Sequence, residues 1–210
     1  MSKYVVFDGM DGSGKGTQLR MLEEVFRDRA VFTREPGGTP FAEEIKKLVR
    51  DNVLAGKSTP LNNLLLFFAA REDLMHHLVT PSLEQGKHVF SDRGYSSTYA
   101  YQICGEEKES LREAFFSLRE QMFEKSGRRR PDLHIVYDLP PEVARTRALS
   151  DAHRSTNHFD ERPLEYYERV RDGFRKFAEE GEAVRFIDAT RAPEEVHRDT
   201  LQALAEAGVV

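Results

Sequence analysis

A glycine-rich stretch near the start of the chain has the residue types of a phosphate-binding loop. Residues 9–18 read GMDGSGKGTQ and lie between an apolar run and the first amphipathic segment. Glycines let successive backbone N–H groups surround a phosphate, the following helix adds its positive end, and Lys15 can reach the outer phosphates. A strand before and a helix after the loop favour nucleotide binding over a turn without a ligand. The predicted ATP-binding residues of the loop are Gly9, Met10, Asp11, Gly12, Ser13, Gly14, Lys15, Gly16 and Thr17.

The loop departs from the usual pattern directly after its lysine. A Ser or Thr commonly stands there and ligates Mg²⁺, but Gly16 follows Lys15 and the hydroxyl comes one place later, at Thr17. We therefore expect the loop to bind phosphate without ligating the metal in the usual way. The predicted Mg²⁺ ligands are nucleotide oxygens, water, Thr17 and nearby carboxylates.

A second group of charged residues follows a later apolar run. Residues 89–102 read VFSDRGYSSTYAYQ, with Asp92 where the apolar run ends. A carboxylate in that position can orient Mg²⁺ through water, and Arg93 can make a forked contact with a phosphate. The alternative is a surface Asp–Arg pair that caps the next helix. The phosphate loop elsewhere in the chain favours the first interpretation.

A third candidate group lies in the segment NLLLFFAARED. Phe67 and Arg71 are four residues apart, so on a helix they share one face. A base could stack on Phe67 while Arg71 donates to a carbonyl oxygen, which thymine and uracil offer where cytosine has an amino group. The alternative places Phe67 in the core and Arg71 in a surface salt bridge. We favour the base pocket, because Leu64, Leu65 and Phe68 can supply the core contacts of this helix.

The elements that must position these residues alternate along the chain. Short apolar runs predict strands at 4–8, 30–33, 88–91, 133–139 and 184–187. Helical periodicity predicts helices at 15–27, 41–50, 61–85, 111–124, 141–149, 164–180 and 194–205. This alternation predicts an α/β fold, a five-stranded parallel sheet with helices on both faces. Ligands of such sheets bind at the carboxyl ends of the strands.

The composition predicts one soluble domain, residues 1–210, of which 39% are apolar and 32% charged. A net charge of −5 argues against a nucleic-acid platform. A single cysteine, Cys104, excludes an internal disulfide and suits a reducing compartment. The chain shows no signal sequence and no apolar span long enough for a membrane, so we expect a cytoplasmic protein with no membrane partner. The seven histidines lack the spacing of a zinc hydrolase.

Several motifs, in order and at suitable spacing, resemble the thymidylate kinase family over nearly the whole chain. They are TREPGGTPFAEEIK from Thr33, FFAAR from Phe67, DRGYSSTYAYQ from Asp92, PDLHIVYDLPPEVA from Pro131, YYERVRDGF from Tyr166 and IDAT from Ile187. The resemblance implies a P-loop kinase fold with a short mobile lid at about 150–161. It also implies transfer of the γ-phosphoryl group of ATP to dTMP with Mg²⁺, giving dTDP for dTTP synthesis, by a protein that is usually a homodimer.

The resemblance assigns roles around the acceptor nucleotide dTMP. It implies that Arg93 holds the acceptor phosphate and that Asp11 lies near the acceptor sugar and the metal. Glu35 and Pro36 fall in the loop beside the acceptor, and for Glu35 the alternative is a loop salt bridge with Arg34. The resemblance also gives Phe67 and Arg71 the stacking and hydrogen-bonding roles proposed above.

Three further positions take their roles from the resemblance alone. Thr98 matches a position that contacts the base, and Tyr101 matches one that crowds the 2′ carbon of the sugar. Arg147 resembles an arginine that lies against the adenine of the donor. The alternatives are an ordinary packing aromatic for Tyr101 and a solvated helix face for Arg147.

The chain also departs from the family pattern. Gly94 stands where an aromatic residue or histidine is common, and Asp8 replaces a usual Glu. The segment NHFD at 157–160 replaces a usual DRFE, so the lid loses the arginine of that motif. Arg154 is then the candidate for the charge-stabilising arginine of the lid, and Asp160 matches an acid near the metal.

The predicted chemistry needs no general base, because the acceptor phosphate is largely ionised at neutral pH. Catalysis is expected from alignment and charge neutralisation by the loop amides and Mg²⁺. The predicted catalytic residues are Lys15, Arg93, Asp11 and Arg154. Two other functions remain open, a kinase of another nucleoside monophosphate and a nucleotide-binding paralogue without turnover.

Overall fold

The strands form one parallel sheet, as the sequence predicts. The computed structural model describes residues 1–51, 57–150 and 162–209. The strands are β1 (Tyr4–Gly9), β2 (Ala30–Arg34), β3 (His88–Asp92), β4 (Leu133–Asp138) and β5 (Val184–Asp188). Their order across the sheet is β2-β3-β1-β4-β5, and every neighbouring pair is parallel. The carboxyl ends of all five strands therefore lie at one edge of the sheet.

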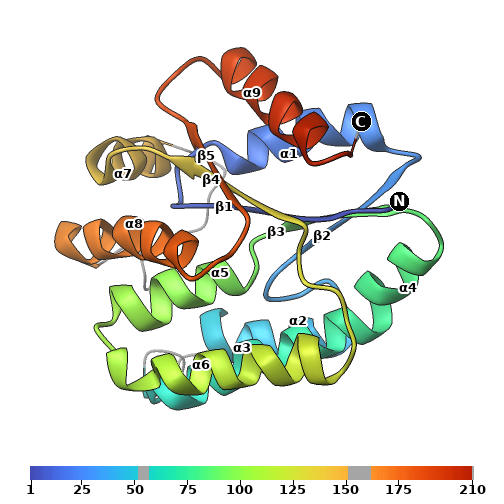
Figure 1. The fold of residues 1–210 in the computed structure, drawn as a ribbon. Coiled ribbons are helices and arrows are strands. Elements are labelled where there is room, and N and C mark those ends of the chain that lie inside the picture. Colours follow the sequence, from blue (N-terminus) through green and yellow to red (C-terminus); the bar gives the residue numbers. More distant parts are fainter. Residues whose placement is uncertain (52–56, 151–161, 210) are drawn as a thin grey trace.

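The central strand β1 is buried on both faces. Successive side chains of a strand point to opposite faces, so Val5 and Phe7 join one apolar core while Tyr4 and Val6 join the other. Helices α1 (Lys15–Phe26) and α9 (Pro193–Glu206) cover one face, and the remaining large helices lie mainly on the opposite side (Figure 1). A phosphate loop that follows β1 is thus anchored between two cores.

The other α-helices are α2 (Pro40–Lys46), α3 (Pro60–Leu74), α4 (Thr80–Glu84), α5 (Tyr95–Thr98), α6 (Arg112–Glu120), α7 (Pro141–Ser150) and α8 (Leu164–Glu179). Wider, π-helical turns extend several of them, at Lys47–Asp51, Met75–Val79, Tyr99–Gly105 and Gln121–Lys125, and a 3₁₀ turn, Glu109–Leu111, precedes α6. The long helix predicted at 61–85 is one helical stretch, made of α3, a π-helical turn and α4. Within the described residues, no helix has the length and apolar character needed to cross a membrane.

One helical stretch, Tyr95–Gly105, is absent from the sequence predictions. Nearly all of its side chains are buried, so it lacks the one-sided apolar pattern by which a helix is found in sequence. Helix α8 approaches it closely, because a Cβ added at Gly173 would lie only 2.9 Å from the Cα of Ala100. This buried helix carries Thr98 and Tyr101, and so forms one wall of the candidate site.

Candidate active site

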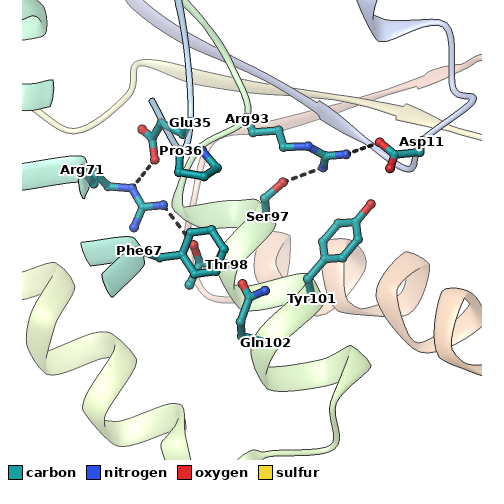
Figure 2. Close-up of a pocket in the computed structure, with 11 residues that line it drawn as sticks. Asp11, Glu35, Pro36, Phe67, Arg71, Arg93, Ser97, Thr98, Tyr101 and Gln102 are labelled. Atoms are coloured by element: carbon teal, nitrogen blue, oxygen red, sulfur yellow. Dashed lines mark hydrogen bonds and ion pairs between the residues drawn. The ribbon is translucent and has the colours of Figure 1, made fainter. Parts of the chain in front are cut away.

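The site lies where three strands end. The phosphate loop follows β1, Glu35 follows β2, and Arg93 follows β3. A pocket at this edge brings together all the residues predicted to bind the acceptor (Figure 2). They are Asp11, Glu35, Pro36, Phe67, Arg71, Arg93, Thr98 and Tyr101.

The pocket has three further lining residues that the sequence predictions missed, namely Gly94, Ser97 and Gln102. Ser97 and Gln102 belong to the buried helix described above, on the same face as Thr98 and Tyr101. Residues one turn apart share a helix face, so the spacing could have identified them had this helix been predicted.

The phosphate loop turns directly into α1. Gly14 precedes the helix with φ 83° and brings no capping side chain, so the first N–H groups of α1 remain directed at the loop. Gly12 has φ 84°, and a Cβ there would collide with the carbonyl oxygen of Ala144. Glycine at this position therefore lets α7 pack against the loop.

Lys15 lies at the inner end of the loop and pairs with Asp92 of β3. Its Nζ is 2.8 Å from Asp92 Oδ1, and Lys15 is only 9% exposed. Although burial opposes ionisation of Asp92, Lys15 and Arg93 hold the pKa of its carboxyl below the ordinary value. The Asp92 carboxylate is thus charged beside the loop, and its ion pair is with Lys15 rather than with the neighbouring Arg93.

Arg93 enters the pocket from a left-handed backbone conformation, φ 72°. Its Nη2 donates to Asp11 Oδ1 at 2.7 Å, and its Nη1 donates to Ser97 Oγ at 3.0 Å and to the Gly9 carbonyl at 3.2 Å. The guanidinium carbon lies 5.1 Å from the centroid of the Tyr101 ring. A non-glycine residue in this conformation costs about 1 kcal/mol or more, so the fold places this arginine with some strain.

Arg71 forms a buried ion pair that the sequence did not predict. Its Nε donates to Glu35 Oε2 at 2.5 Å and its Nη2 to Thr98 Oγ1 at 2.9 Å. Burial raises the pKa of Glu35, and Arg71 opposes that effect. The proposed alternative, a Glu35–Arg34 salt bridge, is wrong, because Arg34 pairs with Glu43 instead.

One donor of Arg71 is left over. Nη1 is buried, yet it has no hydrogen-bond partner among the described residues. A buried donor without a partner is costly, and this one belongs to a side chain that lines the pocket. It is therefore suited to a hydrogen bond with a ligand.

Phe67 and Arg71 both line the pocket, as their helical spacing predicts. Leu64 and Phe68 are buried in the core, whereas Leu65 is 46% exposed. The prediction that Leu65 makes core contacts is wrong, because it lies with Leu61 on the outer side of α3. Phe67 is only partly buried, and it also packs against the small core cluster between α2 and α3.

Of the three residues that the sequence predicts on the ATP and lid side of the site, only Arg147 lies within the described residues. Arg147 is an exposed residue of α7, and its Nη1 and Nη2 donate to the carbonyl oxygens of Ala189 and Thr190 at 2.7 and 3.2 Å. It therefore ties α7 to the turn after β5 and is not simply solvated. Arg154 and Asp160 lie outside the described residues.

The carboxylates near the phosphate loop are suited to a Mg²⁺ ion that takes most of its ligands from substrate phosphates and water. Asp92 and Asp11 are close enough for the Asp11 charge to oppose, in part, the lowering of the Asp92 pKa by Lys15 and Arg93. The hydroxyl of Thr17 accepts from Arg20 Nη2 at 3.3 Å. No group of three or more potential metal ligands occurs within residues 1–51, 57–150 and 162–209. This donor set suits Mg²⁺, which commonly keeps several waters and binds one or two carboxylates together with substrate phosphates.

Comparisons with known proteins agree with the fold and the motifs. Residues 7–200 match the family model described as thymidylate kinase. A thymidylate kinase of Symbiobacterium thermophilum is 37% identical, with 98% of this chain and 94% of that protein aligned. One of Dinoroseobacter shibae is 38% identical, over 98% of this chain and 97% of that protein. The crystal structure of thymidylate kinase from Ehrlichia chaffeensis matches with a TM-score of 0.74 and 29% identity, covering 97% of this chain and 98% of the other.

Proposed function

The chain belongs to the thymidylate kinase family, and on that premise we propose that it transfers the γ-phosphoryl group of ATP to dTMP. The product is dTDP, a precursor of dTTP. The observation that carries this proposal is a pocket that is lined both by Phe67 and by Arg71, which has a buried donor without a partner among the described residues. The family and this pocket together favour a pyrimidine monophosphate as the acceptor.

We propose that the two ends of the pocket bind the two ends of dTMP. Arg71 and the Arg93–Asp11 pair lie at different ends (Figure 2). The base stacks on Phe67 and accepts a hydrogen bond from Arg71, and the phosphate binds Arg93. Tyr101 lies beside Arg93 and leaves little room at the 2′ carbon, which favours deoxyribose. The wall around the base is completed by Glu35, Pro36 and Thr98. Two of them, Glu35 and Thr98, accept hydrogen bonds from Arg71 and so hold it in place.

The residues of the chain act by alignment and charge neutralisation. The loop amides and Lys15 bind the donor phosphates, and Arg93 holds the acceptor phosphate in line with them. Mg²⁺ when bound neutralises charge on the phosphates of ATP, and the residues proposed to hold it are Asp92 and Thr17, with Asp160 and in part through water. As the sequence predicts, we propose that Arg154 supplies a further positive charge to the transferred phosphoryl group and that Arg147 lies on the adenine side of bound ATP.

We further propose one domain over residues 1–210, with a lid at about 150–161, acting in the cytoplasm as a homodimer. A dimer is supported by large apolar side chains that are exposed on α2, its π-helical extension and α3, which pack together. They are Phe41, Leu48, Leu61 and Leu65. Covering such side chains stabilises an association of two copies.

The choice of acceptor tests the proposed function. We expect the protein with Mg·ATP to use dTMP in preference to dCMP, because cytosine leaves the Arg71 donor unpaired. That loss costs about 1 to 3 kcal/mol, or about 5- to 150-fold in kcat/KM. Steady-state assays with dTMP, dUMP, dCMP, UMP, CMP, AMP and GMP measure it. Equal use of dCMP would contradict the base pocket, and nucleotide binding without phosphoryl transfer would favour the inactive paralogue.

The glycine after the loop lysine gives a second prediction. Nothing lies within 4 Å of a Cβ added at Gly16, so Gly16→Ser fits and places a hydroxyl at the usual metal-ligand position. We expect the affinity for ATP to rise about fivefold in Mg²⁺ and to stay unchanged in EDTA. Calorimetric titrations of ATP under both conditions measure this. The matched control is Gly16→Ala, which also replaces the flexible glycine of α1 but has no hydroxyl, and an equal gain in the alanine variant would refute the metal explanation.

A further inference from the structure

A fully buried carboxylate, Asp8, lies at the end of β1, immediately before the phosphate loop. Its relative exposure is 0%. Two hydroxyls from the start of the buried helix donate to it, Ser96 to Oδ2 and Ser97 to Oδ1. Asp8 is not among the residues that line the pocket, so a buried carboxyl group at this position needs another explanation than contact with a substrate.

The Ser96 arm of this network has a fixed hydrogen-bond direction. His134 Nδ1 lies 2.8 Å from Ser96 Oγ. Burial lowers the pKa of His134 to about 3, so the ring is neutral. Because the only hydroxyl proton of Ser96 goes to Asp8, the serine oxygen accepts a hydrogen bond from Nδ1–H of His134. This arm ends in the core, where the Nε2 of His134 has no hydrogen-bond partner among the described residues.

The Ser97 arm ends in the pocket. Ser97 donates to Asp8, and its oxygen in turn accepts from Arg93 Nη1 at 3.0 Å. A guanidinium only donates, so Ser97 accepts from Arg93 and its one hydroxyl proton goes to Asp8. Burial raises the pKa of Asp8, and Arg93 together with the two serine hydrogen bonds opposes this effect. Asp8 Oδ1 is itself 3.9 Å from Arg93 Nη1. Ser97 therefore connects the buried Asp8 carboxyl group to the Arg93 guanidinium by two hydrogen bonds.

The backbone of Arg93 is held as firmly as its side chain. Its N–H donates to the carbonyl of Phe7 at 2.8 Å, and Ser91 Oγ donates to its carbonyl at 2.8 Å. These contacts hold a residue with φ 72°. The backbone fixes where the arginine begins, while Ser97, Gly9 and Asp11 fix where its guanidinium lies.

We propose that Asp8 is a positioning residue for the acceptor phosphate, and that it acts through the Ser97 hydroxyl on the guanidinium of Arg93. This inference rests on the proposed function, in which Arg93 holds the phosphate of dTMP. Groups behind a binding residue keep it in its productive geometry. Asp8 and Ser97 thereby set the affinity for the phosphate and not the affinity for the base or sugar.

Two neighbouring serines provide a matched test. Ser97→Ala removes the link to Arg93, whereas Ser96→Ala removes the same group from the same carboxylate without touching Arg93. We expect Ser97→Ala to raise the Kd of dTMP about five- to tenfold. The Kd of thymidine, which has no phosphate, should stay within about twofold in both variants, and Ser96→Ala should leave the dTMP/thymidine ratio unchanged. Calorimetry or competition binding measures each constant.

A double variant separates this inference from the proposed function. In the Arg93→Ala background, Ser97→Ala should have no further effect on dTMP binding, because the two changes act through one group. Asp8→Asn should reproduce the phosphate-specific loss if it folds, and the serine variants test the inference if it does not. An equal loss of dTMP and thymidine affinity in Ser97→Ala would overturn the inference and leave Arg93 in its role. An Arg93→Ala protein with normal dTMP affinity would instead overturn the proposed phosphate site.

Discussion

We expect Lys15→Ala to lower the turnover number for dTMP phosphorylation by about 10²- to 10³-fold, with a much smaller change in the affinity for ATP. The lysine neutralises charge on the phosphoryl group as it moves, so its loss is felt most in the transition state. The loop amides do not depend on this side chain, because they are set by the backbone around Gly12 and Gly14. Steady-state rates together with direct titration of ATP separate the two quantities.

The control for this variant is a second lysine–aspartate pair. Lys3 lies 3.3 Å from Asp132, among residues that do not line the candidate pocket. Lys3→Ala removes the same type of charge, and we expect its turnover to be close to that of the parent. A folded Lys15→Ala protein with near-normal turnover would refute the role proposed for the loop lysine.

Arg71→Ala should destabilise the folded protein by about 3 to 5 kcal/mol. The substitution leaves the Glu35 carboxylate, 7% exposed, without its partner at 2.5 Å. Urea or thermal unfolding measures the loss. Arg34→Ala is the control, because Arg34 pairs with Glu43 at the surface with 57% of its side chain exposed, and such pairs contribute about 0 to 1 kcal/mol.

The stability loss of Arg71→Ala should depend on pH. Burial raises the pKa of Glu35, and Arg71 is the main group that opposes this. In the variant the folded-state pKa rises further, so the ionised carboxylate disfavours the folded state at neutral pH. As the pH falls towards the unfolded-state pKa, the folded protein binds the proton and the loss shrinks. A loss of equal size at pH 5 and pH 8 would argue against a stranded carboxylate as its cause.

Because Arg71→Ala also destabilises the folded protein, its effect on nucleotide binding is not by itself a clean test of base recognition. A second substitution that restores stability is therefore needed. Glu35→Gln combined with Arg71→Ala removes both charges, and we expect it to recover most of the lost stability. In this double variant dTMP should bind more weakly than in the parent, and the gap between dTMP and dCMP should narrow. An unchanged dTMP/dCMP ratio would show that Arg71 does not distinguish the two bases.

Local patterns in the sequence were enough to predict the sheet and the phosphate loop. The strand and helix alternation held because each strand is a short apolar run and most helices have one apolar face. The loop was identified because its glycines and lysine are contiguous and act through their own backbone and side chains. The helical spacing of Phe67 and Arg71 likewise placed both side chains in one pocket.

Tertiary structure alone decided the partners of the buried charges. The helix at Tyr95–Gly105 shows no one-sided pattern because it is buried all round, so its pocket face could not be inferred from periodicity. Glu35 and Arg71 are 36 residues apart, and Asp8 and Ser97 are 89 apart. Nothing in the local sequence distinguishes Arg71 from Arg34 as the partner of Glu35. Such contacts form only when the parallel strands bring their carboxyl ends to one edge of the sheet. A buried charge there is stable only with a partner of opposite charge, and the packing of the helices determines which residue that partner is.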